Sequence, residues 1–345
     1  VVSLKSGRKN LIINGGMQIA QRGTSVTGTV SGTVNTCDRF ITEYADAAIS
    51  VDSSQVTDAP SGFTHSNKIL VTSGSSLGAS QYLIPFEQRV EGYDFSRLGY
   101  NTPEAKEVTI SFWIKTNRTG TNTVDFTLGG GGTNPFIARQ YTVDVADTWE
   151  YKTITFPANT SATNLVTGSG NGMTIFWWNA ASSTYNSGTI ASGWGTQITA
   201  NRAVGATSTV TTGDYWQITG VQLELGSVAT DFEHRSYGEE LALCQRYYQR
   251  VSERVSMIGS RWSTVHFCSY HMPVSMRGFP TFASSRGDAF QVFGSAATNH
   301  FSTGNSISIA GKENCEIQIT NSNTASSAFI RFTAATDWFS LDAEI

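Results

Sequence analysis

Apolar and polar residues alternate along much of the chain. The clearest runs cover 108–115, 149–156 and 216–225, where apolar residues are interleaved with Thr, Ser, Gln or charged residues. Successive side chains of a strand point to opposite faces of its sheet, so a period of two predicts strands with one buried face. Stretches rich in Gly, Ser, Thr and Asn lie between the runs and are typical of turns. Many short strands without intervening helical periods favour an antiparallel β-sandwich over a βαβ sheet.

One segment departs from this alternation. Ser236 and Glu239 have the spacing of a capping box, in which each side chain accepts a hydrogen bond from the other residue's backbone N–H. Helix-forming residues follow, so the sequence predicts a helix over about 237–252. Its apolar positions form a wide stripe, which predicts packing on more than one surface.

The helix separates two predicted β domains, so the predicted fold class is all-β with one connecting α-helix. The C-terminal part would form a small β-sandwich of its own. A domain of about 90 residues buries little more than ~60% of its unfolded surface, so we expect it to associate with copies of itself. Its expected strands cover 264–267, 289–293, 316–319 and 328–332. The predicted boundaries are a linker at 1–9, the larger β-sandwich at 10–235, the helix at 236–253 and a C-terminal β head domain at 254–345.

Composition limits the classes of partner. Charged residues make up 14% of the chain, well below the ~25% of ordinary globular domains, while aromatic residues reach 11%, too many for a disordered chain. The net charge is −4 and no basic run occurs. Counterion release therefore has no source, and we expect no nucleic-acid partner. No stretch approaches ~20 consecutive apolar residues, so we expect no membrane insertion.

The four cysteines give no sign of a metal or redox site. Cys37, Cys244, Cys268 and Cys315 lie far apart, with no CxxC pair and no Cys/His cluster. We expect four reduced, mostly buried thiols, with at least one disulfide as the alternative. The chain begins with Val1 and shows no signal-peptide core, so we expect an upstream segment and no export signal.

Catalytic motifs are missing from the sequence. It contains neither the GxSxG elbow of hydrolases nor the HExxH of zinc proteases, and its glycine-rich runs lack the Lys-Ser/Thr of a phosphate loop. Any chain with 27 acidic residues offers carboxylate pairs by chance, so such pairs carry no weight alone. We expect no enzymatic activity.

Four stretches resemble one protein family. They are NLIINGGMQIAQRG at 10–23, DRF at 38–40, the stretch 216–248 and MPVSMRGFPT at 272–281. They are similar to tail-fibre-like proteins of phages that infect marine bacteria and cyanobacteria. Asp231 departs from the pattern, since members of the family usually have Pro there.

The resemblance implies a fold and a function. It implies a jelly-roll sandwich like that of carbohydrate-binding modules, in a homotrimeric tail-fibre subunit of the virion, assembled in the host cytoplasm. Such a subunit would attach to a host cell-surface glycan, contact other tail or capsid proteins, and carry no catalytic residues. Three alternatives stay open: a capsid-surface or head-fibre decoration protein, a capsule depolymerase, and a binding module of a bacterial glycosidase.

The same resemblance raises one metal site. Sandwiches of carbohydrate-binding modules often hold Ca²⁺ where the first and last strands meet, and oxygen atoms are the ligands that Ca²⁺ prefers. Asn14, Asp38 and Glu224 would be the candidate ligands. The other interpretation is that the first two make turn hydrogen bonds and that Glu224 is an exposed strand carboxylate. No other cofactor is expected.

Aromatic residues outside the core are the candidate ligand contacts, because saccharides stack their apolar CH faces on flat rings. Trp177 and Trp178 are neighbours on an expected strand and must point to opposite faces, so at least one, with Trp178 the candidate, leaves the core unless another subunit covers it. Tyr185 and Trp194 lie in a loop of small residues, where Trp194 contacts a ligand or subunit or else packs locally. The tryptophans of the alternating strands are expected to pack in the core or on a sheet surface: Trp113, Trp149 and Trp216.

The C-terminal domain offers a second candidate surface. An upstream anchor would leave this domain at the tip of a fibre, where receptor contact belongs. The residues expected to line a distal receptor patch are Tyr270, His271, Arg286, Asp288 and Trp338, together with His300; ordinary loop positions are the alternative.

Overall fold

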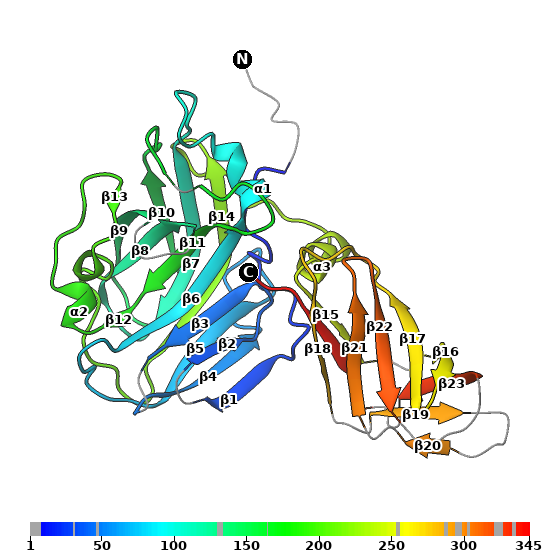
Figure 1. The fold of residues 1–345 in the computed structure, drawn as a ribbon. Coiled ribbons are helices and arrows are strands. Elements are labelled where there is room, and N and C mark those ends of the chain that lie inside the picture. The colour runs from blue at the N-terminus through cyan, green and yellow to red at the C-terminus, as the bar shows by residue number, and fades with distance from the viewer. Residues whose placement is uncertain are drawn as a thin grey trace. The chain divides into compact units, whose positions relative to one another are not determined.

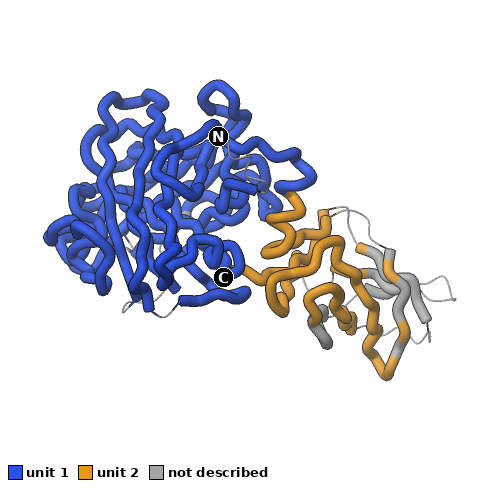
Figure 2. Tube along the Cα trace, turned by 90° about the horizontal axis from the view of Figure 1, so that it is seen from above, with its two compact units in different colours: residues 1–240, 345 blue, residues 241–344 orange. Residues whose placement is uncertain are grey.

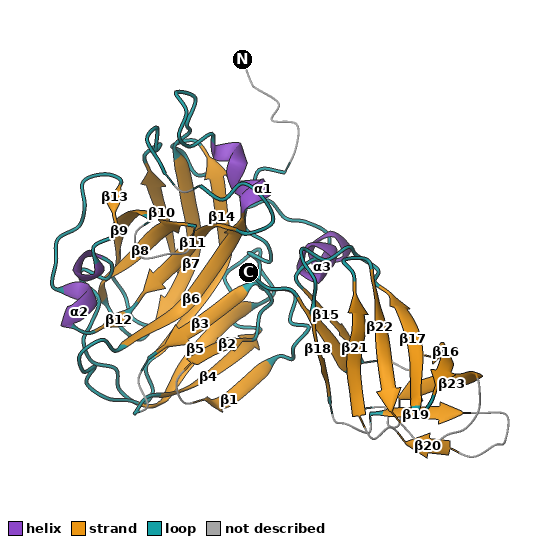
Figure 3. Cartoon of the chain, in the orientation of Figure 1, coloured by secondary structure: helices purple, strands orange, loops and turns teal. Residues whose placement is uncertain are grey.

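The computed structural model shows a chain built mainly of strands (Figures 1 and 3). Within the described residues the chain divides into two compact units, residues 1–240 with Ile345 and residues 241–344 (Figure 2). The described residues are 8–29, 32–45, 48–129, 134–163, 165–252, 256–285, 289–293, 299–301, 304–320, 327–332 and 336–345.

The first unit contains two large antiparallel sheets. The six-stranded sheet has the order β1 (Ser25–Thr29), β4 (Ser50–Val56), β5 (Ser66–Ser73), β14 (Tyr215–Leu225), β7 (Val108–Thr116) and β10 (Glu150–Phe156). The eight-stranded sheet has the order β13 (Gly195–Thr196), β9 (Pro135–Val143), β8 (Gly120–Leu128), β11 (Asn171–Trp178), β6 (Tyr82–Glu91), β3 (Phe40–Tyr44) and β2 (Gly32–Asn35), with β12 (Ala180–Ala181) paired to β6. The helical turns of this unit are α1 (Gly92–Phe95), η1 (Ser96–Leu98), α2 (Ser183–Asn186) and η2 (Thr199–Asn201).

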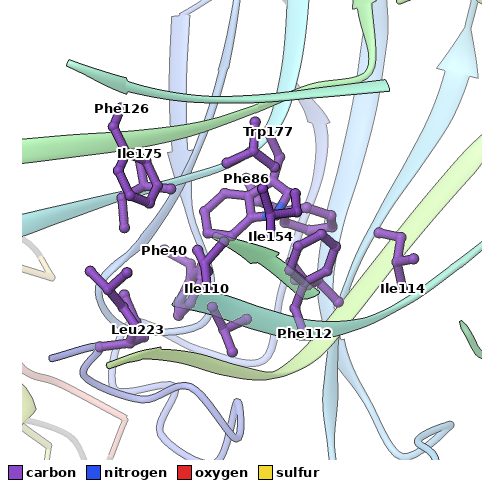
Figure 4. Packing of buried hydrophobic residues seen from close by; sticks show 14 of the residues in the cluster. Phe40, Phe86, Ile110, Phe112, Ile114, Phe126, Ile154, Ile175, Trp177 and Leu223 are labelled. Carbon is purple, nitrogen blue, oxygen red and sulfur yellow. The ribbon is translucent and has the colours of Figure 1, made fainter. Parts of the chain in front are cut away.

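The hydrophobic core lies between the inner faces of these two sheets (Figure 4). It takes Ile110, Phe112 and Ile114 from β7 and Ile175 and Trp177 from β11, all with no more than 1% of their surface exposed. Burial of one such side chain stabilises the fold by about 1.5–3 kcal/mol, so the alternation decides which face of each strand turns inward. The predicted all-β sandwich is confirmed.

Strand β14 interrupts its alternation once. Ile218 and Val221 both face the core although they are three residues apart. Between them Gly220 has φ +62°, and the pairing with β7 shifts by one residue, which is a β-bulge. A Cβ at this position would lie 2.7 Å from the Phe63 ring, so the conformation and the space both require glycine.

The segment before β1 runs beside β14 and explains part of the motif at 10–23. The Asn10 side chain donates to the Val221 carbonyl (3.1 Å) and accepts from the Leu223 N–H (3.0 Å). A Cβ on Gly15 would lie 2.1 Å from the same Val221 carbonyl oxygen. These hydrogen bonds and the close approach of Gly15 hold the N-terminal segment against β14.

The helix α3 (Tyr237–Gln245) is shorter than predicted. Its capping box is confirmed, because Ser236 N–H donates to Glu239 Oε2 (2.9 Å) and Glu239 N–H donates to Ser236 Oγ (3.3 Å). The predicted second half is wrong, since β15 (Tyr248–Val251) pairs instead with β24 (Phe339–Asp342). Pairing with a strand far along the chain overrides weak local helix preference.

The second unit contains two sheets. Strand β18 (Thr281–Ser284) joins β24 and β15 in a three-stranded sheet. The seven-stranded sheet has the order β20 (Asn299–Phe301), β19 (Phe290–Phe293), β23 (Ser327–Phe332), β16 (Ser256–Trp262), β17 (Val265–His271), β22 (Asn314–Thr320) and β21 (Gly304–Ala310). The four predicted C-terminal strands correspond to β17, β19, β22 and β23, with ends that differ by up to four residues.

All four cysteines are free and buried, as predicted. Burial raises the pKa of Cys268 to about 12 and that of Cys315 to about 11, so both thiols stay protonated at neutral pH. Every helix among the described residues is too short or too polar to cross a membrane.

Candidate functional site

The outer face of the eight-stranded sheet carries a small hydrophobic cluster of its own. Trp177 and Trp178 point to opposite faces, as predicted: Trp177 belongs to the core, while Trp178 packs with Ile84 and Ala203 outside it. Phe176, two residues before Trp178 on β11, shares this outer face.

The chain between β12 and β14 folds back over this face and forms a wall. Asn186 in α2 donates to the carbonyls of Ala181 (2.8 Å) and Ala206 (3.0 Å). The Ala203 N–H donates to the Tyr185 carbonyl (2.9 Å). These hydrogen bonds join the start of the wall near Ala181 to its end near Ala206. They hold Tyr185 beside Trp178 on the outer face of the sheet.

Four rings and one guanidinium form what we call the aromatic pocket. Tyr185 lies with its ring centroid 5.3 Å from those of Tyr82 and Trp178. The Arg202 guanidinium lies over Trp178 (4.6 Å) and Phe176 (4.7 Å), in cation–π geometry. The pocket has a volume of about 330 Å³, within the range of small-molecule sites. Trp178 is only 1% exposed, so the partly exposed rings beside it are the ones that a ligand can reach.

Arg202 is held in place by a buried carboxylate. Asp125 on β8 is fully buried and accepts from Arg202 Nε (3.0 Å) and from Trp178 Nε1 (2.6 Å). Burial raises the pKa of Asp125, although both partners favour its ionised form. The pair fixes the guanidinium and the indole in one arrangement.

An acidic pair lies at the other end of the pocket. Glu43 accepts from the Tyr82 hydroxyl (2.6 Å), and Glu87, which is fully buried, accepts from Arg89 Nε (2.6 Å). Burial raises the pKa of Glu87 to about 7. The nearby Arg89 guanidinium lowers this pKa, and the nearby Glu43 carboxyl raises it further.

Two buried acceptors lack a donor in this pocket. Asn171 Oδ1 has no partner among the described residues, while its amide donates to Thr174 Oγ1 (2.7 Å). Glu87 Oε2 likewise receives no N–H or O–H from the described residues. Buried acceptors are nearly always satisfied in proteins, so an unsatisfied pair in a pocket marks where ligand donors fit.

Trp194 lies away from the aromatic pocket. Its Nε1 donates to the Pro157 carbonyl (2.7 Å), and its ring packs edge-on against Tyr100 (5.5 Å between centroids). It lines a separate hollow of about 200 Å³ with Asn159 and Thr196. Trp194 therefore packs against the core of the first unit and not within its own loop, and its contact with a ligand stays a prediction.

The described side chains of the predicted receptor patch, those of Tyr270, His271 and Trp338, do not contact one another. Tyr270 packs edge-on against the buried Phe339 (5.1 Å), and Trp338 lies under the Arg250 guanidinium (4.6 Å). His271 is exposed at the end of β17. None of these contacts joins one predicted residue to another. Of the remaining predicted positions, Arg286 and Asp288 lie outside the described residues, and His300 lies in β20, where the structure describes the backbone alone.

The predicted calcium ligands are engaged with protein donors. Asn14 Oδ1 accepts from the Ile19 N–H (2.9 Å), and the Asp38 carboxylate accepts from the backbone and side chain of Gln21. Glu224 is buried, not exposed, and accepts from Thr230. The described residues also contain no cluster of three or more Asp, Glu, His or Cys arranged for a metal. These residues do not fit Ca²⁺, and the predicted site is corrected to a set of turn and loop hydrogen bonds.

Several residues of the aromatic pocket were not predicted. Phe176 could have been found, because a residue two positions from Trp178 on a strand must share its face. Tyr82 could not, since β6 changes its alternation beside Pro85, where Ile84 turns outward and Phe86 inward. Arg202 lies in a loop whose sequence gives no sign of the buried Asp125.

Comparison with known proteins gives a likeness of architecture. No family model matches the chain, and no curated protein matches it. Solved structures similar to it include the tailspike protein 4 enzymatically active domain of bacteriophage CBA120 (TM-score 0.33, 14% identity, 63% of this chain and 21% of that chain). Others are TmCBM61 in complex with β-1,4-galactotriose (0.30, 12%, 63% and 99%) and a CBM4 structure (0.30, 12%, 61% and 97%). The chain spans about a fifth of the length of the tailspike chain. At these TM-scores the likeness extends to the two-sheet architecture alone.

Proposed function

We propose that the first unit binds a saccharide in the aromatic pocket and leaves it chemically unchanged. The observation that carries this proposal is the combination of partly exposed rings with two buried acceptors that lack donors. A sugar presents apolar CH faces to rings and a row of hydroxyl donors to acceptors. It therefore satisfies both features with one molecule.

The polar groups of the pocket also support a neutral ligand. Arg202 is paired with Asp125, and Arg89 is paired with Glu87. No cation of this set is left without a carboxylate, so an acidic sugar gains no charge partner. Neutral hydroxyl-rich units fit better.

The engagement of the acidic pair supports binding without hydrolysis. A glycosidase uses one carboxyl group as general acid and a second as nucleophile or base. Glu43 accepts from the Tyr82 hydroxyl (2.6 Å) and Glu87 accepts from Arg89 Nε (2.6 Å), so protein donors hold both carboxyl groups.

In its biological setting, we propose that the chain is a receptor-binding subunit of a phage tail fibre, present in three copies on the virion. The motifs at 10–23 and 272–281 support this proposal through their resemblance to such proteins. Three copies convert weak sugar contacts into useful avidity through effective concentration. Light scattering on the full chain tests the assembly, and a stable monomer would count against it.

The binding proposal is tested with a glycan array followed by calorimetry on the full chain. Tyr185→Ala removes one reachable ring, and Tyr93→Ala is the matched control because Tyr93 is 60% exposed in α1 and lines none of the pockets described above. We expect Tyr185→Ala to weaken binding by roughly 3- to 10-fold, while the control leaves it unchanged.

Two outcomes would overturn the proposal. Equal affinities of Tyr185→Ala and the wild type would remove the aromatic pocket as the site. New reducing ends after incubation with a bound polysaccharide, abolished in Glu87→Gln, would replace binding by hydrolysis.

A further inference from the structure

The opposite face of the sandwich, the outer face of the six-stranded sheet, holds a second hollow of about 360 Å³. It lies over the β-bulge of β14, so we call it the bulge pocket. Its lining comes from β7, β10, the bulge, the loop at 61–63 and the segment 229–234. None of its lining residues belongs to the aromatic pocket.

Two groups of rings form the walls of the bulge pocket. On one side Trp113 and Tyr151 are cross-strand partners with ring centroids 5.3 Å apart. On the other side Phe63 contacts Phe232 (5.0 Å) and His234 (5.4 Å). Gly220 lies between the two groups: a Cβ there would meet the Phe63 ring at 2.7 Å and the Trp113 ring at 3.0 Å.

The second wall is rigidly attached to the sheet. Thr230 donates to Glu224 through its N–H and through its hydroxyl, both at 2.8 Å. Glu233 N–H donates to Gln222 Oε1 (2.8 Å), and the Glu233 carboxylate accepts from the Asn10 N–H (2.8 Å). A site built in advance in this way loses little entropy when a ligand binds.

Polar groups at the bulge pocket are left without partners in the described residues. The hydroxyls of Ser111 and Tyr151, the indole N–H of Trp113 and the carboxylate of Asp231 make no hydrogen bond there. Asp231 is exposed, and at the same rim Lys9 Nζ donates to the Thr230 hydroxyl (2.6 Å) and to the Asp231 carbonyl. Hydrogen-bond donors and acceptors therefore surround an apolar slot whose rim carries one ammonium and one carboxylate.

We propose that the bulge pocket is a second, independent saccharide site that takes a neutral pyranose unit between its two aromatic walls. A flat apolar ring with hydroxyls at its edge matches the slot and the unpaired groups together. The Asp231 carboxylate accepts from sugar hydroxyls, and the Lys9 ammonium at the same rim is balanced by it, so an acidic sugar gains no net attraction there. Because the two pockets lie on the outer faces of two packed sheets, one sandwich would hold two glycan segments at once.

The indole N–H signal of Trp113 in the ¹H–¹⁵N spectrum of the full chain tests this proposal. The signal is assigned by its loss in Trp113→Phe. The probes are neutral β-1,4-linked oligosaccharides of glucose, galactose, xylose and mannose, with oligogalacturonate as the acidic control. We expect at least one neutral probe to shift the signal and the acidic probe to leave it in place.

The variants separate the bulge pocket from the aromatic pocket. We expect Tyr151→Ala to weaken the response of Trp113 by roughly 3- to 10-fold, while Tyr185→Ala and the control Tyr93→Ala preserve it. A Trp113 response that survives in Tyr185→Ala supports the second site even if the aromatic pocket proves inert.

Three results would overturn the proposal. The first is the absence of any Trp113 shift with every neutral probe up to its solubility limit. The second is a shift that disappears in Tyr185→Ala, since it would be relayed from the other face. The third is a shift that follows protein concentration without sugar, because a second copy of the chain would then occupy the hollow.

Discussion

The two outer faces of the sandwich hold hollows of similar size but opposite polar character. In the aromatic pocket the charged groups are paired inside the protein, as Arg202 is with Asp125 and Glu87 is with Arg89. At the bulge pocket the Trp113 indole and the Asp231 carboxylate have no described partner. The charges of the first site are paired before a ligand arrives, and among its described residues only the acceptors Asn171 Oδ1 and Glu87 Oε2 await a donor. The second site depends on the ligand or on water for its charged group as well.

This difference predicts whether a mutation lowers the stability of the fold or only the binding of a ligand. Removing a paired group of the aromatic pocket leaves its partner buried and unsatisfied, so the fold loses stability. Removing an unpaired group at the bulge pocket leaves nothing behind, so only binding changes. Stability measurements on matched variants of the two faces can therefore break or sharpen the comparison.

The largest effect is expected at Asp125. Asp125→Ala leaves Arg202 and the Trp178 indole without their shared acceptor, and we expect a loss of about 3–5 kcal/mol in the free energy of unfolding. Asp58 on the other face is the matched control, since it pairs with Lys115 (2.9 Å) but its side chain is 47% exposed. We expect about 1 kcal/mol or less for Asp58→Ala by urea denaturation. Equal losses would remove the distinction between the faces.

A slightly smaller effect is expected at the bulge. Gly220→Ala combines left-handed backbone strain with contacts to Phe63 and Trp113, and we expect a loss of roughly 2–4 kcal/mol. Gly28 has nearly the same φ, +64° against +62°, with open space around it. Gly28→Ala therefore reports the strain alone, about 1–2 kcal/mol in the same urea titration. If the Gly220 variant is no less stable than the Gly28 variant, the rings of Phe63 and Trp113 can move apart to admit the added methyl group.

The pH dependence of stability reports on Glu87. Its pKa of about 7 in the folded state lies above the ordinary 4.5, so the folded state holds more protons between these values. This contribution is complete below about pH 4.5 and is lost as pH rises through about 7. We expect Glu87→Gln to flatten the pH curve by on the order of 3 kcal/mol. Parallel curves for wild type and Glu87→Gln would contradict the assignment.

The smallest effect separates two hydroxyl groups. Tyr82→Phe deletes a hydroxyl that donates to Glu43 at 2.6 Å, and we expect a loss of about 1 kcal/mol. Tyr151→Phe deletes a hydroxyl without a partner, and we expect a change within about 0.5 kcal/mol. Thermal unfolding of the two variants side by side measures the difference, and the reverse order would contradict the comparison.

The sequence predicted the architecture better than the sites. Alternation found the strands and assigned Trp177 and Trp178 to opposite faces, because a period of two is a local property. The capping box located the start of α3, while its early end depends on pairing with residues near 340, which no local window contains. The calcium set failed for a related reason, since hydrogen bonds from Gln21, Ile19 and Thr230 decide what those oxygens do.

The aromatic pocket shows the same limit. Its rings come from β6, β11 and α2, and Arg202 reaches it from the loop after η2, so they meet only after the chain has folded back. Trp194 was grouped with Tyr185 because both lie in one loop, yet their contacts are separate. Proximity along a loop is a poor guide to proximity in space.

The bulge at Gly220 shifts the alternation of inward and outward side chains by one residue within a single strand. Before the bulge the even-numbered residues face the core, and after it the odd-numbered residues do, so both halves of β14 pack against the same core. Deleting one residue there would turn half of the strand inside out, exposing Val221 and Leu223 to water.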